Sequence, residues 1–133
     1  KYKNLDTVII NTKELRHELR DKDSDIKILM KKLSNMHNFK NVIVTRGTEG
    51  SILFDKKYNK FIDMDAFAKN AVDKIGAGDT MLSLIALCRR SKLDNHLSLL
   101  MASLGAAMSV KTYANKKILD KNQILKSLEN ILK

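Results

Sequence analysis

The sequence has few of the residues that would indicate a secreted, membrane-bound or zinc-binding protein. Cys88 is the only cysteine among 133 residues, so no disulfide can form within the chain and we expect a reducing compartment. The three histidines show no ligand spacing with one another or with Cys88, which argues against a zinc site. No secretory signal is recognisable, and no apolar run is long enough to span a bilayer. These absences predict a cytoplasmic protein without a membrane partner.

Aromatic residues are also scarce. Tryptophan is absent and aromatic residues make up 5% of the chain, so there are few stacking platforms for single-stranded nucleic acid. The formal net charge of +10 would permit nucleic-acid binding by long-range attraction. However, the lysines are interspersed with acids, as around Asp21, Asp23 and Asp25. We therefore predict a solvated basic surface and no nucleic-acid partner, and keep a basic nucleic-acid-binding domain as the less favoured alternative.

Strand-like and helix-like segments alternate along the chain, which predicts an α/β fold. A run dominated by β-branched residues predicts a strand at residues 7–10, and strands or extended segments are also expected at residues 42–45, 51–54 and 60–63. Apolar residues at helical spacing predict helices at residues 12–20, 24–36, 77–90, 93–111 and 121–132. Ser24 and Asp120 are expected to cap two of them. Since no repeat or boundary is visible, we expect one α/β domain over residues 1–133.

Two glycines and an aspartate stand at the start of the predicted helix 77–90. Gly76 and Gly78 lack Cβ, so the backbone can turn tightly and its amides can approach an anion closely. The first N–H groups of a helix have no acceptor within the helix and carry the positive end of its dipole. Asp79, in the first turn, is placed to accept a proton from a hydroxyl that is being phosphorylated. An ordinary loop with Asp79 as a helix cap is the alternative, and the pattern alone leaves both open.

Two further patterns precede this loop. Asn11 and Glu14 follow the predicted strand 7–10, and their spacing matches a capping box. Thr45, Gly47 and Gly50 form a T-x-G-x-x-G turn between two predicted strands. A β-hairpin with glycines at positive φ explains that spacing equally well.

All three patterns resemble motifs of one family, the ribokinase-like (PfkB) carbohydrate kinases. Residues 72–80, Val-Asp-Lys-Ile-Gly-Ala-Gly-Asp-Thr, resemble the family's C-terminal signature D-T-x-G-A-G-D. The two earlier patterns resemble its N-x-x-E and V-T-x-G-x-x-G motifs and stand in the family's order. This order is the discriminating fact, because three independent weak patterns rarely coincide by chance. One departure is Lys74, where the family usually has Thr.

The resemblance implies ATP-dependent phosphorylation of a sugar or sugar-phosphate hydroxyl, with magnesium as a cofactor. The catalytic candidates are Asp79 as the base and Gly76, Ala77 and Gly78, with the amide of Asp79, as the anion hole for the γ-phosphoryl group. The nucleotide-site candidates are Thr45, Arg46, Gly47, Gly50, Ala106, Val110 and Asn115. The metal candidates are Asn11, Glu14 and Asp73. Asp73 also lies where family members often bind a monovalent cation, and Lys74 is a departure from the family's pattern at this cation site.

The nucleotide-site assignments differ in what else could explain each residue. Arg46 would add positive charge near a polyphosphate, while Ala106 and Val110 would line the adenine pocket and Asn115 would offer a polar contact. The predicted helix 93–111 is rich in small residues, so tight packing against the helix of the glycine loop explains Ala106 and Val110 as well.

The fold that the resemblance implies is the C-terminal part of a doubly wound layered fold, a sheet flanked by helices, with ATP outside the carboxyl ends of the strands. Family members are roughly twice this length, so we expect the C-terminal, nucleotide-binding half of a larger sugar kinase. Lys1 is not an initiator methionine, which agrees. The isolated half is expected to be inactive, and its exposed apolar surface favours a homodimer.

The acceptor stays open at this point. The Gly-Asp-Thr sequence and the stretch 116–120 favour a heptose-phosphate type of acceptor. Adenosine, ribose, fructose and fructose phosphate remain alternatives. A non-catalytic nucleotide-binding or interaction module is the alternative from a different functional class.

Overall fold

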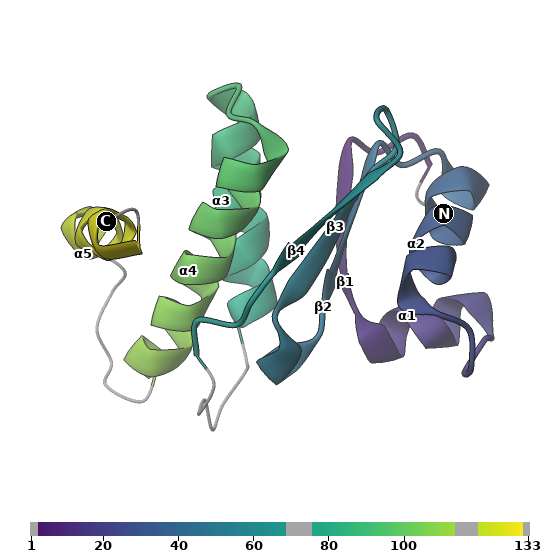
Figure 1. Ribbon diagram of the computed structural model, residues 1–133, viewed down its shortest axis with the longest axis horizontal. Coiled ribbons are helices and arrows are strands. Elements are labelled where there is room, and N and C mark those ends of the chain that lie inside the picture. The colour runs from purple at the N-terminus through teal and green to yellow at the C-terminus, as the bar shows by residue number, and fades with distance from the viewer. Residues whose placement is uncertain (1–2, 69–75, 114–119, 132–133) are drawn as a thin grey trace. The chain divides into compact units, whose positions relative to one another are not determined.

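The computed structural model describes residues 3–68, 76–113 and 120–131. The chain falls into two compact units, Lys1–Asp63 and Met64–Lys133 (Figure 1). Each unit has a hydrophobic cluster of its own. The expectation of one domain over residues 1–133 stays a prediction.

A four-stranded sheet in the order β1-β2-β3-β4 forms the centre of the first unit. Its strands are β1 Thr7–Asn11, β2 Asn41–Thr45, β3 Ser51–Asp55 and β4 Lys60–Met64. β1 pairs with β2 in parallel, and β2 pairs with β3 antiparallel. The α/β class expected from the sequence is therefore confirmed, with each strand within one residue of its predicted ends.

Helices α1 Thr12–Leu19 and α2 Ile26–His37 lie between β1 and β2 in the chain and cover one face of the sheet (Figure 1). Side chains alternate across a strand, so Val42 and Val44 face these helices while Ile43 points to the opposite face. The buried cluster under the helices consists of Leu15, Leu19, Leu29, Met30, Leu33, Phe39, Val42, Val44, Ile52 and Phe54. This apolar contact holds the loop ends of β1 and β2 in place.

The connection between α1 and α2 corrects one prediction. Asp25, not Ser24, caps α2, and its side chain accepts a hydrogen bond from the backbone N of Lys27 at 2.7 Å. Ser24 is engaged elsewhere: its backbone N and its hydroxyl donate to the two carboxylate oxygens of Asp21, at 3.0 and 2.8 Å. These backbone and side-chain hydrogen bonds lower the pKa of Asp21.

Three helices make up most of the described second unit: α3 Ala77–Arg90, α4 Asn95–Tyr113 and α5 Lys121–Ile131. α3 has the bounds that the sequence predicts, while α4 begins later because Asp94 caps it, accepting from the backbone N of Leu97 at 2.9 Å. Asp120 accepts from the backbone N of Asn122 at 3.1 Å, which confirms the predicted cap of α5.

Close packing of α3 against α4 depends on a missing side chain. A Cβ added at Gly105 of α4 would collide with the Leu84 side chain of α3. At Gly105, therefore, a small residue serves the packing of α4 against α3, as the packing interpretation expects. None of the helices in the described ranges has the length and apolar character needed to cross a membrane.

The core of the first unit can be tested with two neighbouring residues of α2. Leu29 is fully buried, whereas Ile28 is 61% exposed. We expect Leu29→Ala to lower the free energy of unfolding by about 2–5 kcal/mol because it leaves a cavity. Ile28→Ala, the matched control, should change it by less than about 0.5 kcal/mol. Urea unfolding followed by circular dichroism measures both, and equal losses would contradict the packing described above.

Cys88 offers a second test, in the second unit. Its thiol is buried, with Sγ 3.9 Å from Sδ of Met101, and burial raises the pKa of Cys88. Since the thiolate is the reactive form, we expect folded protein to react with a thiol reagent at pH 8 at least about tenfold more slowly than urea-unfolded protein. Equal rates would show an accessible thiol in place of a packed one.

Candidate functional site

Two of the three sequence motifs meet at one edge of the sheet. Asn11 ends β1 and Thr45 ends β2, and the two residues lie opposite each other in the parallel ladder. The hydroxyl of Thr12 also donates to the backbone O of Thr45 at 3.3 Å, which ties the start of α1 to the end of β2. In open α/β sheets, ligands bind outside the carboxyl ends of parallel strands. The first two motifs therefore occupy the edge where a ligand is expected.

Asn11 and Glu14 form a complete capping box. The side-chain oxygen of Asn11 accepts from the backbone N of Glu14 at 2.8 Å, and a carboxylate oxygen of Glu14 accepts from the backbone N of Asn11 at 2.9 Å. The structural interpretation of this pair is confirmed, and both residues are also exposed. The second carboxylate oxygen of Glu14 is not used by the box.

The side-chain oxygens of Asn11 and Glu14 suit a magnesium ion that is already bound to a nucleotide better than one held by protein ligands alone. No group of three His, Cys, Asp or Glu side chains that could hold a metal is found within the described ranges. Magnesium usually keeps several waters and binds one or two carboxylates together with substrate phosphates. Asn11 and Glu14 fit such a partial site. Asp73, the third metal candidate, lies outside the described residues.

The T-x-G-x-x-G motif forms the turn between β2 and β3. A short 3-10 helix, η1 Gly47–Glu49, fills this turn, and the backbone N of Arg46 donates to the O of Gly50 at 2.8 Å. Gly47 has φ 65° and Gly50 has φ 85° and ψ −137°. The hairpin with positive-φ glycines is therefore confirmed. The shape of the turn requires glycine at Gly50, where a Cβ would strain the backbone.

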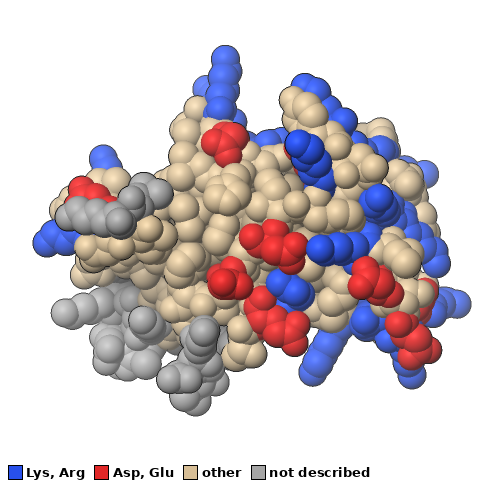
Figure 2. All heavy atoms as spheres, in the orientation of Figure 1, with Lys and Arg blue, Asp and Glu red and all other residues tan. Residues whose placement is uncertain are grey.

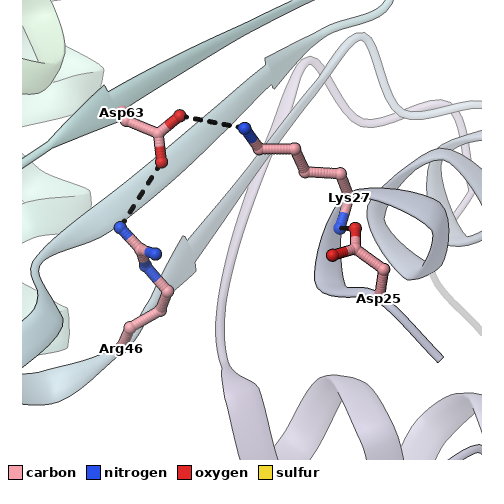
Figure 3. A network of polar contacts seen from close by, with 4 residues as sticks. All are labelled: Asp25, Lys27, Arg46 and Asp63. Carbon is pink, nitrogen blue, oxygen red and sulfur yellow. Dashed lines mark hydrogen bonds and ion pairs between the residues drawn. The ribbon is translucent and has the colours of Figure 1, made fainter. Parts of the chain in front are cut away.

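Arg46 lies in this turn with a partner that the sequence did not reveal. Its Nη2 is 3.5 Å from Oδ1 of Asp63 in β4, and Oδ2 of Asp63 is 3.2 Å from Nζ of Lys27 in α2 (Figure 3). No local pattern indicates Asp63 or Lys27, because the contacts of Asp63 with Arg46 and with Lys27 arise only when the hairpins and α2 have folded together. The closest signal was the expected strand at 60–63, which ends at Asp63 but says nothing of its partners.

The glycine loop leads directly into α3. Gly76 is the N-cap, with φ 82° and no side-chain hydrogen bond, and the N of Thr80 donates to the O of Gly76 at 3.0 Å. The amides of Ala77, Gly78 and Asp79 precede this bond, so they have no acceptor inside the helix. The carboxylate of Asp79 is exposed, and in the described part of the chain it has no hydrogen-bond or ion-pair partner. The helix start thus presents three amides without acceptors inside the helix, with an exposed acid beside them.

The remaining nucleotide candidates are less accessible. Ala106 and Val110 lie in α4 and are 9% and 8% exposed, so their side chains are buried in the second unit. Their place at an adenine pocket stays a prediction. Asn115 lies outside the described residues.

Charge is mixed on the surface, as the sequence predicts. On the face of the molecule that Figure 2 draws, Asp and Glu side chains lie among the Lys and Arg side chains. An extended surface of one sign is the usual electrostatic footprint of nucleic-acid binding. The absence of a nucleic-acid partner remains a prediction.

An α/β chain with a glycine turn at the carboxyl edge of its strands and a helix start whose first amides have no helical acceptors, beside a carboxylate, has the features of a phosphate-binding kinase domain. Comparison with known sequences gives the family. Residues 2–121 match the pfkB family of carbohydrate kinases. The chain belongs to this family.

Individual relatives agree. The chain is 38% identical over 113 residues to the "Bifunctional protein HldE" of Campylobacter curvus, a match that covers 83% of this chain and 24% of that protein. The solved ribokinase of Thermotoga maritima superimposes with a TM-score of 0.80 at 24% identity, over 94% of this chain and 42% of that one. The Arabidopsis thaliana ribokinase complexed with ribose and ATP gives a TM-score of 0.74 at 25% identity, over 91% and 40%. The ribokinase-like fold is thereby confirmed.

These matches also show how much of each relative the chain represents. It spans about a quarter of the curated relative and about two fifths of the ribokinases. Most of each relative therefore has no counterpart in this chain.

The glycine loop gives a test that separates backbone strain from anion binding. Among the described residues, and apart from its neighbours along the helix, a Cβ would meet no atom within 4 Å at either Gly76 or Gly78, but only Gly76 has positive φ. We expect Gly76→Ala to destabilise the protein by roughly 1–2 kcal/mol through strain, whereas Gly78→Ala should stabilise the helix by up to about 1 kcal/mol. Thermal unfolding measures both.

The same variants then report on the anion site. If a phosphate sits against the amides at the start of α3, the added methyl group of Gly78→Ala should weaken ATP binding even though the variant folds well. Calorimetric titration with ATP and magnesium measures this. Unchanged affinity in a stable Gly78→Ala protein would count against an anion at this position.

Proposed function

We propose that the protein carrying this chain transfers the γ-phosphoryl group of ATP to a hydroxyl of a sugar or sugar phosphate, and that this chain supplies its nucleotide-binding part. The observation that carries the proposal is the start of α3, where an exposed Asp79 stands beside three amides without helical acceptors. Membership of the pfkB family supports it. So does the ribokinase relative whose structure contains ribose and ATP.

The chemistry assigned to these groups is proton removal and charge stabilisation. Asp79 accepts the proton of the acceptor hydroxyl as the new O–P bond forms to the γ-phosphorus. The bond from that phosphorus to the bridging oxygen breaks, and ADP leaves with the bond's electron pair. The amides of Ala77, Gly78 and Asp79, positioned by Gly76, hold the negative charge of the transferring group. Fixed donors of this kind contribute much of the rate enhancement in such sites.

The nucleotide is assigned to the turn after β2. Thr45, Gly47 and Gly50 would bind the phosphates and ribose through backbone and hydroxyl groups, because glycines let the chain approach a ligand closely. Arg46 would offset the charge of the polyphosphate. Of the more distant candidates, Ala106 and Val110 would border the adenine, with Asn115 as a polar contact.

Magnesium is assigned to Asn11 and Glu14, acting through its waters, with Asp73 as a further ligand. When bound, the ion neutralises phosphate charge and fixes the geometry of the polyphosphate. A monovalent cation near Asp73 remains a prediction of the family resemblance.

The acceptor is the least determined part of the proposal. A heptose-phosphate type of acceptor is the one that the sequence favours, so it is the first to assay. A cytoplasmic location and a homodimer remain predictions of the same standing.

Asp79→Asn tests the catalytic assignment in the whole protein. The substitution keeps the shape of the side chain but removes the base, so we expect turnover to fall by about a hundredfold or more with little change in ATP affinity. Steady-state kinetics with ATP and a panel of sugars and sugar phosphates, together with calorimetry, measure both. Glu129→Gln, which removes an exposed carboxylate on α5, is the matched control and should leave both values unchanged.

Two results would count against the proposal. Equal turnover in Asp79→Asn and the parent would remove Asp79 as the base. ATP binding without phosphorylation of any sugar or sugar phosphate in the panel would favour the non-catalytic nucleotide-binding module instead.

A further inference from the structure

The turn between β2 and β3 fixes the backbone of Arg46. Its N donates to the O of Gly50 at 2.8 Å, and its O accepts from the N of Glu49 at 3.3 Å. The Arg46 side chain is only 20% exposed. A long cationic side chain that is mostly buried has few orientations open to it, and what it contacts decides which of them it takes.

The contact is made by Asp63, which comes from another element. Oδ1 of Asp63 is 3.5 Å from Nη2 of Arg46, and Oδ2 is 3.2 Å from Nζ of Lys27 (Figure 3). Lys27 is held in turn by the cap of α2, where its backbone N donates to Asp25 at 2.7 Å. Asp63 thus lies between two cations, one in the turn after β2 and one at the start of α2.

Asp63 lies at the same edge of the sheet as the first two motifs. β3 and β4 are neighbours joined by the short turn of residues 56–59, so they run antiparallel. Since β3 is also antiparallel to β2, β4 runs in the direction of β2 and ends at the same edge. Asp63 is the penultimate residue of β4, and its contact with Arg46 places it near the end of β2 that carries Thr45.

The energetics favour a role in orientation over a role in folding. The side chains of Lys27 and Asp63 are 46% and 51% exposed, and ion pairs this open contribute only about 0–1 kcal/mol to stability. One donor of Arg46, its Nε, is buried without a hydrogen-bond partner among the described residues. An unpaired buried donor is unfavourable, and a phosphate oxygen is a strong acceptor for a guanidinium.

We propose that Asp63 is a positioning residue for nucleotide binding, which holds the guanidinium of Arg46 in place to meet the polyphosphate while Lys27 holds Asp63 from the other side. The inference rests on the proposed function and adds a residue to it. Asp63 itself does not touch ATP. Its negative charge is partly screened by solvent and paired with Lys27, so losing the ordered Arg46 outweighs the gain from removing a distant like charge.

The test is a double-mutant cycle in the whole protein, with Asp63→Asn, Arg46→Ala and the double variant. ATP with magnesium is the first probe, and inorganic tripolyphosphate is the second, because it isolates the phosphate contribution. We expect Asp63→Asn to raise the KM and Kd for ATP roughly three- to tenfold with kcat nearly unchanged, and Asp63→Glu to recover part of the loss. In the Arg46→Ala background, Asp63→Asn should have no further effect, because Asp63 acts through Arg46.

Matched controls separate this effect from folding and from general charge. Asp65→Asn removes an exposed carboxylate two residues further along the chain and should leave ATP affinity unchanged. Urea unfolding of each variant checks that the fold is kept, and Asp63→Ser replaces Asp63→Asn if the latter is unstable.

Three results would overturn the inference, and the third would also overturn the proposed function. ATP affinity that is unchanged or tighter in Asp63→Asn, or equal effects of Asp63→Asn with and without Arg46, would remove Asp63 as a positioning residue while leaving the kinase proposal intact. A parent protein that binds neither ATP nor tripolyphosphate would overturn the proposed function together with this inference.

Discussion

The parallel pairing of β1 with β2 is the constraint on which the edge site of the first unit depends. It places Asn11 opposite Thr45 and so brings two motifs together that are far apart in the sequence. The register is fixed because Val8 and Ile10, like Val42 and Val44, must face α1 and α2. A slip of one residue would turn these side chains away from the helices and expose them. Burial of aliphatic side chains therefore determines where polar groups lie at the edge.

Most of the secondary structure was predictable because its determinants are local. α3 has the predicted bounds, since glycine before a helix and an apolar periodicity after it are both visible in the sequence. The cap of α2 was assigned to the wrong residue because Ser24 and Asp25 are both good caps and adjacent. The choice between them depends on Asp21, whose carboxylate takes both hydrogen bonds that Ser24 can donate. Competition of this kind is decided by the folded loop and not by propensity.

The candidate site was predictable only as far as motifs reach. Thr45, Gly50 and Asp79 could be proposed because the motifs that contain them have particular residue types at fixed spacing. Asp63 and Lys27 could not, since an aspartate late in a strand and a lysine early in a helix have no pattern of their own. Their significance comes from a third residue, Arg46, which the folded sheet brings to Asp63. Residues that act through another residue are those that single-sequence reasoning is least able to find.

The capping box at the start of α1 has a thermodynamic consequence for metal uptake. One carboxylate oxygen of Glu14 already stabilises the first turn of the helix by accepting from Asn11. A cation that drew this oxygen away would weaken that turn by about 1 kcal/mol, and this amount would be subtracted from its affinity. An ion that arrives already chelated by a nucleotide brings its own ligands and can leave the turn intact. If magnesium binds at Glu14 as proposed, the helix start would therefore favour an ion that leaves the capping box intact, such as one already chelated by ATP.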